Sequence, residues 1–286
     1  MQIVRTISAL REALSAYRKA GDSVALVPTM GALHAGHMAL VEEARRRARR
    51  VVVSIFVNPI QFGANEDLSA YPRREATDVK LLDDAGCDLL WLPSAEEMYP
   101  AGFATSISVA GVSGGLCGAV RPGHFTGVAT VVAKLFNQVR PDTALFGEKD
   151  YQQLAVIRQL NRDLDFGIAI VGVATQREDD GLALSSRNIY LSQEARAVAR
   201  GLPRAMGEAA RAIQAGGDVA QVLDNARARI LAAGFDSVDY VELRDAATLA
   251  PMAVLDRDGR LLVAARIGGT RLIDNLAVSA SSADAA

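Results

Sequence analysis

Apolar runs and amphipathic segments alternate along the first 175 residues of the chain. The amphipathic segments carry apolar side chains at helical spacing, whereas the apolar runs are short, as expected for buried strands. We therefore predict helices over residues 6–20, 37–49, 75–85, 128–139 and 151–164. The predicted strands cover 24–27, which Pro28 should end, and 51–57, 89–92, 144–146 and 168–173, with a weaker one at 106–109. This alternation is typical of α/β proteins and predicts a Rossmann-like, doubly wound parallel sheet.

The pattern changes after Thr175. A polar, Gly-bearing connector spans 176–188, and Ala-rich helical segments follow at 195–215 and 219–233. Short strands are predicted at 238–243, 261–267 and 271–277. Helices followed by neighbouring strands indicate a second, smaller α+β domain. We place the boundary near residue 184, which gives domains 1–184 and 185–286.

Composition and charge narrow the function classes. Hydrophobic residues make up 50% of the chain, enough for a sizeable core, and the net charge of −2 argues against nucleic-acid binding. The Arg-rich run 45–50 is interpreted as the solvated end of a helix. Residues 1–14 show no secretion signal, and no run reaches the ~18–20 apolar residues of a membrane span. Two cysteines without metal-binding spacing complete the expectation of a reduced, cytoplasmic protein.

The segment from Val24 to His37 carries the strongest functional pattern. Its apolar run is followed by Gly31, Gly36 and two histidines, His34 and His37, and then by a helical pattern. Glycine lets a backbone approach a ligand closely, and a helix start offers N–H groups and positive dipole to an anion. The segment therefore predicts a phosphate site. An alternative interpretation is that the histidines only cap the helix.

Other polar clusters follow the predicted strands at 58–61 and 147–153. Because carboxyl ends of parallel strands share one edge of a sheet, we expect these clusters and the histidines to converge. Lys149 and Gln153 are four apart, hence on one helical face, and a Lys at a helix start suggests an anionic ligand. Gln61 and Gln153 could both donate to and accept from a small polyfunctional substrate. A solvent-exposed Lys and ordinary surface glutamines remain the alternatives.

Two further groups of polar residues lie near glycines. Ser185, Ser186 and Arg187 offer hydroxyls and a cation on a loop preceded by Gly181, which is suited to closing over phosphates. Arg121 and His124, beside a Gly-rich loop, either line the cleft where the polar clusters converge or fix that loop, and the sequence favours neither outcome.

These motifs resemble a known family. The H-x-G-H pattern of His34–His37 and the Ser185–Arg187 loop are similar to signatures of the class I synthetase-like nucleotidyltransferase superfamily. The wider segments that carry a closer resemblance, to the pantothenate synthetase (pantoate–β-alanine ligase) family, are Pro28–His37, Phe56–Phe62, Arg121–Phe125, Phe146–Gln153, Asp180–Asn188 and Arg271–Asn275. The resemblance runs through both predicted domains.

The resemblance implies ATP-dependent condensation of (R)-pantoate with β-alanine to pantothenate, through a pantoyl adenylate, with release of AMP and pyrophosphate. It also implies Mg²⁺, a homodimer, an ATP- and pantoate-binding first domain, and a second domain that covers the active site. The implied catalytic residues are His34, His37, Lys149, Ser185, Ser186 and Arg187. The implied ATP-binding residues are Met30, Gly31, Ala32, Leu33, His34, Ala35, Gly36, His37, Gly147, Glu148, Lys149, Asp150, Gln176, Leu184, Ser185, Ser186 and Arg187.

The same resemblance assigns Met30, Gln61 and Gln153 to substrate binding and Asp78 to the metal. Gln176 departs from the family, in which an aliphatic residue commonly meets adenine through its backbone. A backbone contact survives a change of side chain, so the functional expectation stands.

Three other functions remain open. Another adenylyltransferase of the superfamily would keep the histidines and the serine loop but lack the paired glutamines. A small aminoacyl-tRNA synthetase would need a tRNA-binding surface, which the charge of −2 and the compact second domain do not suggest. A nucleotide sensor without activity would have lost Lys149 or a histidine, and all are present.

Overall fold

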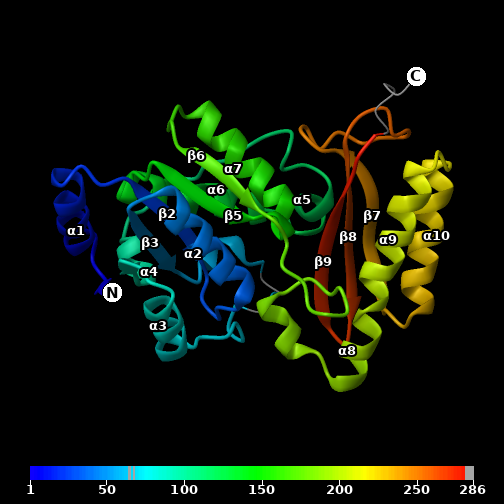
Figure 1. Ribbon diagram of the computed structural model, residues 1–286, viewed down its shortest axis with the longest axis horizontal. Helices are drawn as coiled ribbons and strands as arrows, with labels where there is room; N and C mark the ends of the chain where they lie inside the picture. Colours follow the sequence, from blue (N-terminus) through cyan, green and yellow to red (C-terminus); the bar gives the residue numbers. More distant parts are fainter. Residues whose placement is uncertain (64–65, 67, 281–286) are drawn as a thin grey trace. The chain divides into compact units, whose positions relative to one another are not determined.

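Six segments between residues 2 and 173 pair into one parallel sheet, of which Figure 1 labels β2, β3, β5 and β6. The strand order is β1-β4-β3-β2-β5-β6. The computed structural model describes residues 1–63, 66 and 68–280. The strands are β1 Gln2–Val4, β2 Val24–Thr29, β3 Arg50–Ile55, β4 Leu89–Trp91, β5 Thr143–Gly147 and β6 Ala169–Val173. The helices and 3-10 turns along these strands are α1 Ile7–Lys19, α2 Ala35–Arg47, η1 Pro59–Gln61, α3 Glu75–Asp84, α4 Ala95–Met98, α5 Leu116–Val120, α6 His124–Val139, η2 Glu148–Asp150 and α7 Tyr151–Asp163. The predicted α/β class is confirmed.

Side chains from both faces of this sheet are buried, which explains the unbroken apolar runs. On one face Val27 and Val53 pack with Leu40 of α2 and Leu82 of α3. On the other face the indole Nε1 of Trp91 donates to Gln138 Oε1 of α6 at 3.2 Å. Reversal of the strand order between β2 and β5 requires this arrangement, because right-handed crossovers in opposite directions place their helices on opposite faces.

Several predicted boundaries in this region are wrong, among them the end of β3, which lies at Ile55 and not at residue 57. β2 continues through Pro28 to Thr29, because its pairing with β5 ends at Leu26 and a proline is tolerated where a strand has one neighbour. α2 begins at Ala35, since His34 already caps it, and Arg50 lies in β3, outside the helix. α6 begins at His124, directly after Gly123, whose φ of 81° is left-handed.

The weak strand predicted at 106–109 is absent from the described residues. The backbone N–H of Ile107 donates instead to Thr130 Oγ1 of α6 at 2.9 Å, so this segment bonds to a side chain and has no strand partner there. The three-residue strand β1 and the one-turn helices α4 and α5 were not predicted, because segments this short carry almost no periodic signal.

A second sheet is antiparallel, in the order β7-β8-β9, with β7 Ser237–Asp245, β8 Gly259–Ile267 and β9 Thr270–Val278. The helices α9 Gly201–Gln214 and α10 Val219–Ala232 pack against this sheet through small apolar side chains such as Ala205, Ala209 and Ala226. The expected helix 195–215 is divided at Arg200 into α8 Gln193–Ala199 and α9. Gly201 packs closely at this break, where a Cβ would lie 2.8 Å from the Cβ of Ala233. The predicted smaller α+β part is confirmed.

The chain divides into two compact units, one of residues 1–148 and 156–174, the other of 149–155 and 175–286. Residues 175–184 therefore group with the second unit, before the expected boundary. Their contacts explain this, because Arg177 binds Asp274 of β9. No helix among the described residues is both long and apolar enough to cross a membrane.

Candidate active site

The strand order of the first unit reverses between β2 and β5. Open α/β sheets bind ligands outside the carboxyl ends of the strands at such a switch point. The turn after β2, the segment after β3 and Gly147 at the end of β5 all lie at this edge, because the three strands are adjacent and parallel. The sheet thus places Met30, Gln61 and Gly147 at one edge of the first unit, where the strand pattern predicted them.

The turn after β2 is fixed by Asp78 of α3. Its Oδ2 accepts from the Ala32 N–H and its Oδ1 from the Leu33 N–H, both at 2.9 Å. Asp78 is 2% exposed. Gly31 has φ +82°, and a Cβ there would lie 3.1 Å from Asp78 Oδ2. Close packing on Asp78 and the left-handed backbone together require glycine at this position.

His34 and His37 cap the first turn of α2. The Nδ1 of His34 accepts from the Gly36 N–H at 3.1 Å, and the Nδ1 of His37 accepts from the His34 N–H at 3.3 Å. The ring centroids are 4.1 Å apart. Both histidines therefore cap the helix start. Because Nδ1 is the acceptor in both rings, each neutral ring carries its proton on Nε2, and a donor for phosphate remains compatible with the cap.

Gln61, in η1, is held by a buried amide network. Its Oε1 accepts from Asn58 Nδ2 at 2.9 Å, and its Nε2 lies 3.2 Å from Met30 Sδ. Tyr99 donates to Asn58 Oδ1 at 2.8 Å. The backbone of η1 also lies close to Gly127 of α6, where a Cβ would fall 2.5 Å from the Ile60 carbonyl oxygen. Gln61 is 8% exposed, so it is not an ordinary surface glutamine.

Arg121 and His124 extend the support of Gln61. Arg121 forms a bidentate ion pair with Glu66, with both N–O distances 2.6 Å, and its Nη1 lies 3.0 Å from His124 Nε2. The Nδ1 of His124 lies 2.9 Å from the carbonyl oxygen of Gln61. Burial raises the pKa of Glu66, but the Arg121 hydrogen bonds outweigh it and hold the pKa at about 2. These contacts are the ones expected if Arg121 and His124 fix their own loop.

A cavity of about 310 Å³ opens beside the β2 turn in the first unit. Met30, Gly31 and Asp78 line one part of it, and residues 72–75 line another. Arg73 and Arg74 belong to this lining and are exposed. They were not among the predicted site residues, because arginines in a polar loop carry no spacing signal.

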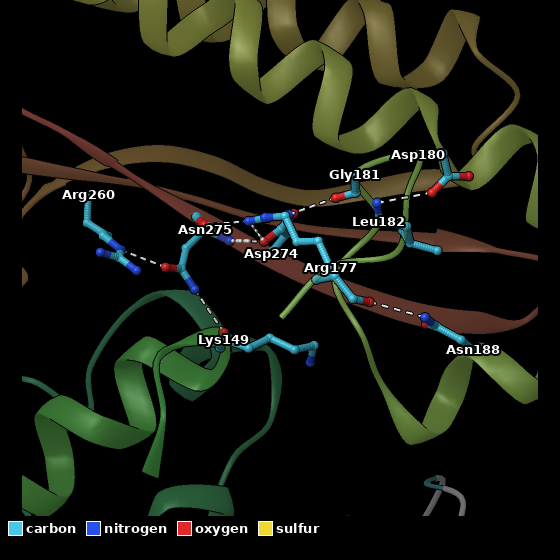
Figure 2. Close-up of polar contacts among 10 residues, drawn as sticks. Lys149, Arg177, Asp180, Gly181, Leu182, Asn188, Arg260, Asp274 and Asn275 are labelled. Atoms are coloured by element: carbon cyan, nitrogen blue, oxygen red, sulfur yellow. Dashed lines mark hydrogen bonds and ion pairs between the residues drawn. The ribbon is translucent and has the colours of Figure 1, made fainter. Parts of the chain in front are cut away.

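In the second unit, Lys149 lies in the 3-10 turn η2 at the start of α7, and Gln153 lies in α7. The predicted shared face therefore spans a 3-10 turn and an α-helix. The Lys149 side chain is 18% exposed, and its Nζ lies 3.9 Å from Asp150 Oδ2. This lysine is therefore largely covered and not the solvent-exposed one of the alternative. Figure 2 shows that its carbonyl oxygen accepts a hydrogen bond from Asn275 Nδ2, at 2.8 Å.

The serine loop is also ordered by its own contacts. Ser185 caps the 3-10 turn η3 Ser186–Tyr190, because its Oγ accepts from the Arg187 N–H at 3.2 Å. The Leu184 N–H donates to the Gln176 carbonyl oxygen at 2.9 Å, which joins the start of the predicted connector to the residue before Ser185. Lys149, Asp150, Gln153, Gln176 and Leu184–Arg187 thus belong to the second unit, and the residues after β2 and β3 to the first.

The model of the pantoate-β-alanine ligase family matches residues 2–277. This match spans nearly the whole chain, and it decides the family. The chain belongs to the pantoate–β-alanine ligase family. Pantothenate synthetase of Rhizorhabdus wittichii is 66% identical over 97% of this chain and 99% of its own length. The one from Caulobacter vibrioides is 55% identical over 96% and 98%.

Solved structures of the ligase family agree with the fold. Pantothenate synthetase from Thermus thermophilus has a TM-score of 0.93 at 50% identity and covers 98% of this chain and 100% of its own. Pantoate-β-alanine ligase from Francisella tularensis, solved as a complex with β-γ ATP and β-alanine, has a TM-score of 0.82 at 33% identity, covering 96% and 97%.

Proposed function

We propose that this chain condenses (R)-pantoate with β-alanine, using ATP, to form pantothenate, AMP and pyrophosphate. The observation that carries the proposal is the 66% identity over 97% of the chain to a pantothenate synthetase. The ligand pair of the Francisella tularensis complex, β-γ ATP and β-alanine, fits the same reaction.

The chemistry proceeds in two steps. A carboxylate oxygen of pantoate attacks the α-phosphorus of ATP, and the bond to pyrophosphate breaks, which gives pantoyl adenylate. The amine of β-alanine, having lost a proton, then attacks the acyl carbon, the amide bond forms, and AMP leaves. Both steps develop charge on phosphate oxygens, so fixed donors are needed more than a protein nucleophile.

We assign those donors to two sets of residues. His34 and His37 offer Nε2–H groups while their Nδ1 atoms hold the helix cap. Lys149, Ser185, Ser186 and Arg187 supply the remaining cations and hydroxyls. The backbone of Gly31–His37, Gly147–Asp150, Gln176 and Leu184 contacts the nucleotide. The Met30 backbone with Gln61 and Gln153 holds pantoate, and Gln61 also faces β-alanine.

Magnesium is assigned to the nucleotide as MgATP and not to a protein site. Both oxygens of Asp78 already accept backbone N–H bonds. Among residues 1–63, 66 and 68–280, no group of three His, Cys, Asp or Glu side chains could hold an ion. Because Asp78 already holds two backbone N–H groups of the turn, we assign this carboxylate to the turn and the metal to the phosphates of ATP.

Two broader properties complete the proposal. Both cysteines are buried free thiols, which is compatible with a reducing, cytoplasmic location. A homodimer is the assembly that the family resemblance implies, and sedimentation of the purified chain measures it.

The deciding experiment measures AMP and pyrophosphate with pantoate and β-alanine omitted in turn. ATP with pantoate alone should give one equivalent of pyrophosphate, and AMP should appear only after β-alanine is added. Release of ADP and phosphate would instead indicate an acyl phosphate. Turnover with another acid in place of pantoate would point to a different adenylyltransferase of the superfamily.

A further inference from the structure

Two adjacent polar residues of β9, Asp274 and Asn275, are buried in the second unit. They are 3% and 2% exposed, respectively. Burying a carboxylate and an amide is costly unless each is hydrogen-bonded. Apolar side chains would serve a sheet core better, so the contacts of this pair should show what it does (Figure 2).

Asn275 fixes the turn that carries Lys149. Its Nδ2 donates to the Lys149 carbonyl oxygen at 2.8 Å, and its Oδ1 accepts from Arg260 Nε at 2.6 Å. Tyr151 directly follows the same turn, and the guanidinium of Arg260 lies 4.2 Å from the centroid of the Tyr151 ring. Tyr151 in turn donates to the Ala246 carbonyl oxygen at 2.7 Å. The amide of Asn275 therefore holds the Lys149 backbone to the sheet.

Asp274 fixes the segment that leads to the serine loop. Its two oxygens accept from Arg177 Nη1 and Nη2 at 2.7 and 2.9 Å. Arg177 Nη1 also donates to the Gly181 carbonyl oxygen at 2.9 Å, and its Nη2 to the Asn275 carbonyl oxygen at 3.3 Å. Gly181 lies shortly before Ser185 in the chain. The Arg177 guanidinium therefore joins the start, or root, of that loop to β9.

We propose that Asp274 and Asn275 are the positioning residues of the adenylation site, acting through Lys149 and through the root of the Ser185–Arg187 loop. This inference rests on the proposed function. Donors stabilise a transition state only when they are held in place beforehand, and a displacement of about 1 Å costs about 10²-fold in rate. Asn275 bonds the backbone of one element directly, and Asp274 reaches the other through Arg177.

The test uses Asn275→Asp, which keeps an acceptor for Arg260 but turns a second oxygen toward the Lys149 carbonyl. Single-turnover pyrophosphate formation from ATP and pantoate should slow about 10- to 100-fold, with little change in the ATP concentration for half-saturation. Asp274→Asn should give a similar loss, since an amide cannot accept both Arg177 bonds. Asn275→Ser, which removes both side-chain bonds without adding charge, serves if the aspartate variant does not fold.

A double-mutant cycle separates positioning from general stability. If Asn275 acts through Lys149, the Asn275→Asp change should cost little further rate in a Lys149→Met background. Asn161→Asp is the matched control, because the Asn161 amide also donates to a backbone carbonyl, that of Ile168, at 3.1 Å. Asp239→Asn is the control for Asp274, since Asp239 pairs with Arg271 at 2.7 Å. Both controls should keep the wild-type rate.

Two results of the cycle overturn the inference. One is that the rate losses of Asn275→Asp and Lys149→Met add. The other is that the control variants lose as much rate as the Asn275 and Asp274 variants for the same fall in melting temperature. Wild-type rates in correctly folded Asn275 and Asp274 variants overturn it as well. In all these outcomes the wild-type chain still makes pantothenate. Failure of the wild-type chain to form pyrophosphate from ATP and pantoate is a different result and contradicts the proposed function itself.

Discussion

His37 accepts the backbone N–H of His34 through its Nδ1, 3.3 Å away, while the Nδ1 of His34 accepts that of Gly36. Two imidazoles thus perform the work that Ser and Glu perform in an ordinary capping box. The proton of each neutral ring is thereby assigned to Nε2. The same pair of residues can hold a helix start and present donors to an anion.

Substitution at His34 should separate these two roles. Asn is a favoured N-cap, so His34→Asn should keep stability within about 0.5 kcal/mol, whereas His34→Ala should lose about 1 kcal/mol. Both variants lack the Nε2–H donor and should adenylate pantoate about 10²-fold more slowly. Urea unfolding and single-turnover pyrophosphate release measure the two effects. A normal rate in His34→Asn would leave this histidine with the cap alone.

Lys149 should matter for adenylation through its charge. Lys149→Met keeps much of the apolar stem, and we expect a fall of about 10²–10³-fold in pyrophosphate formation. Lys80→Met, on the exposed face of α3 where Lys80 pairs with Asp84, is the matched control. The amide-forming step, started from chemically made pantoyl adenylate, should change less. A normal rate of pyrophosphate formation in Lys149→Met would leave this lysine without a role in adenylation.

Asp78 should act on stability and not on the metal requirement. Asp78→Asn leaves one oxygen and one NH₂ where two backbone N–H groups now find acceptors, so unfolding free energy should fall by about 1–3 kcal/mol. The Mg²⁺ concentration for half-maximal rate should stay unchanged. Asp84→Asn, on the exposed side of α3, should affect neither. A raised Mg²⁺ requirement with normal stability would restore the metal assignment.

The correctly predicted strands and helices have compositions that burial dictates. Val51–Val53 of β3 are fully covered on both faces and read as a strand, and the apolar α6 reads as a buried helix. Boundaries were less predictable, because a neighbour decides them. Pro28 stays in β2 only because β5 no longer pairs there.

The support of the site was least predictable. The bond from Asn275 to the Lys149 carbonyl joins residues 126 apart in sequence, and Asp78 lies 46 residues from the Ala32 N–H that it accepts. No local pattern contains such pairs. His34, His37, Lys149 and Ser185 could be selected because a helix start or Gly-preceded loop has its own chemistry, whereas Asn275 gains its role only from packing.

Gln153 should bind pantoate and not ATP. Gln153→Ala removes an amide that can donate and accept, so pantoate affinity should fall by about 1–3 kcal/mol while ATP affinity changes little. Gln159→Ala, on the same helix, removes an amide that bonds Asp163 and should alter neither affinity. Titration calorimetry with each ligand measures both. Equal losses for ATP and pantoate would mean that Gln153 supports the fold.

The Glu66–Arg121 pair should make stability depend on acid. The pKa of Glu66, which burial raises and the Arg121 hydrogen bonds lower more strongly, is about 2 against an ordinary 4.5. A lowered pKa means that the stabilisation is fully present above about pH 4.5 and is lost as the pH falls toward 2. Its size should be modest, because the Glu66 side chain is 23% exposed and solvent screens the pair.

Glu66→Gln tests this dependence, because the amide cannot titrate and keeps the shape. Between pH 6 and pH 3 the wild-type chain should lose more unfolding free energy in urea than the variant does, so the two curves should converge in acid. Glu12→Gln, on the exposed side of α1, should follow the wild-type curve throughout. Because Arg121 contacts His124 and His124 contacts the Gln61 carbonyl, Glu66→Gln should also weaken pantoate binding at neutral pH. Parallel curves for wild type and Glu66→Gln would show that this ion pair contributes nothing that acid can remove.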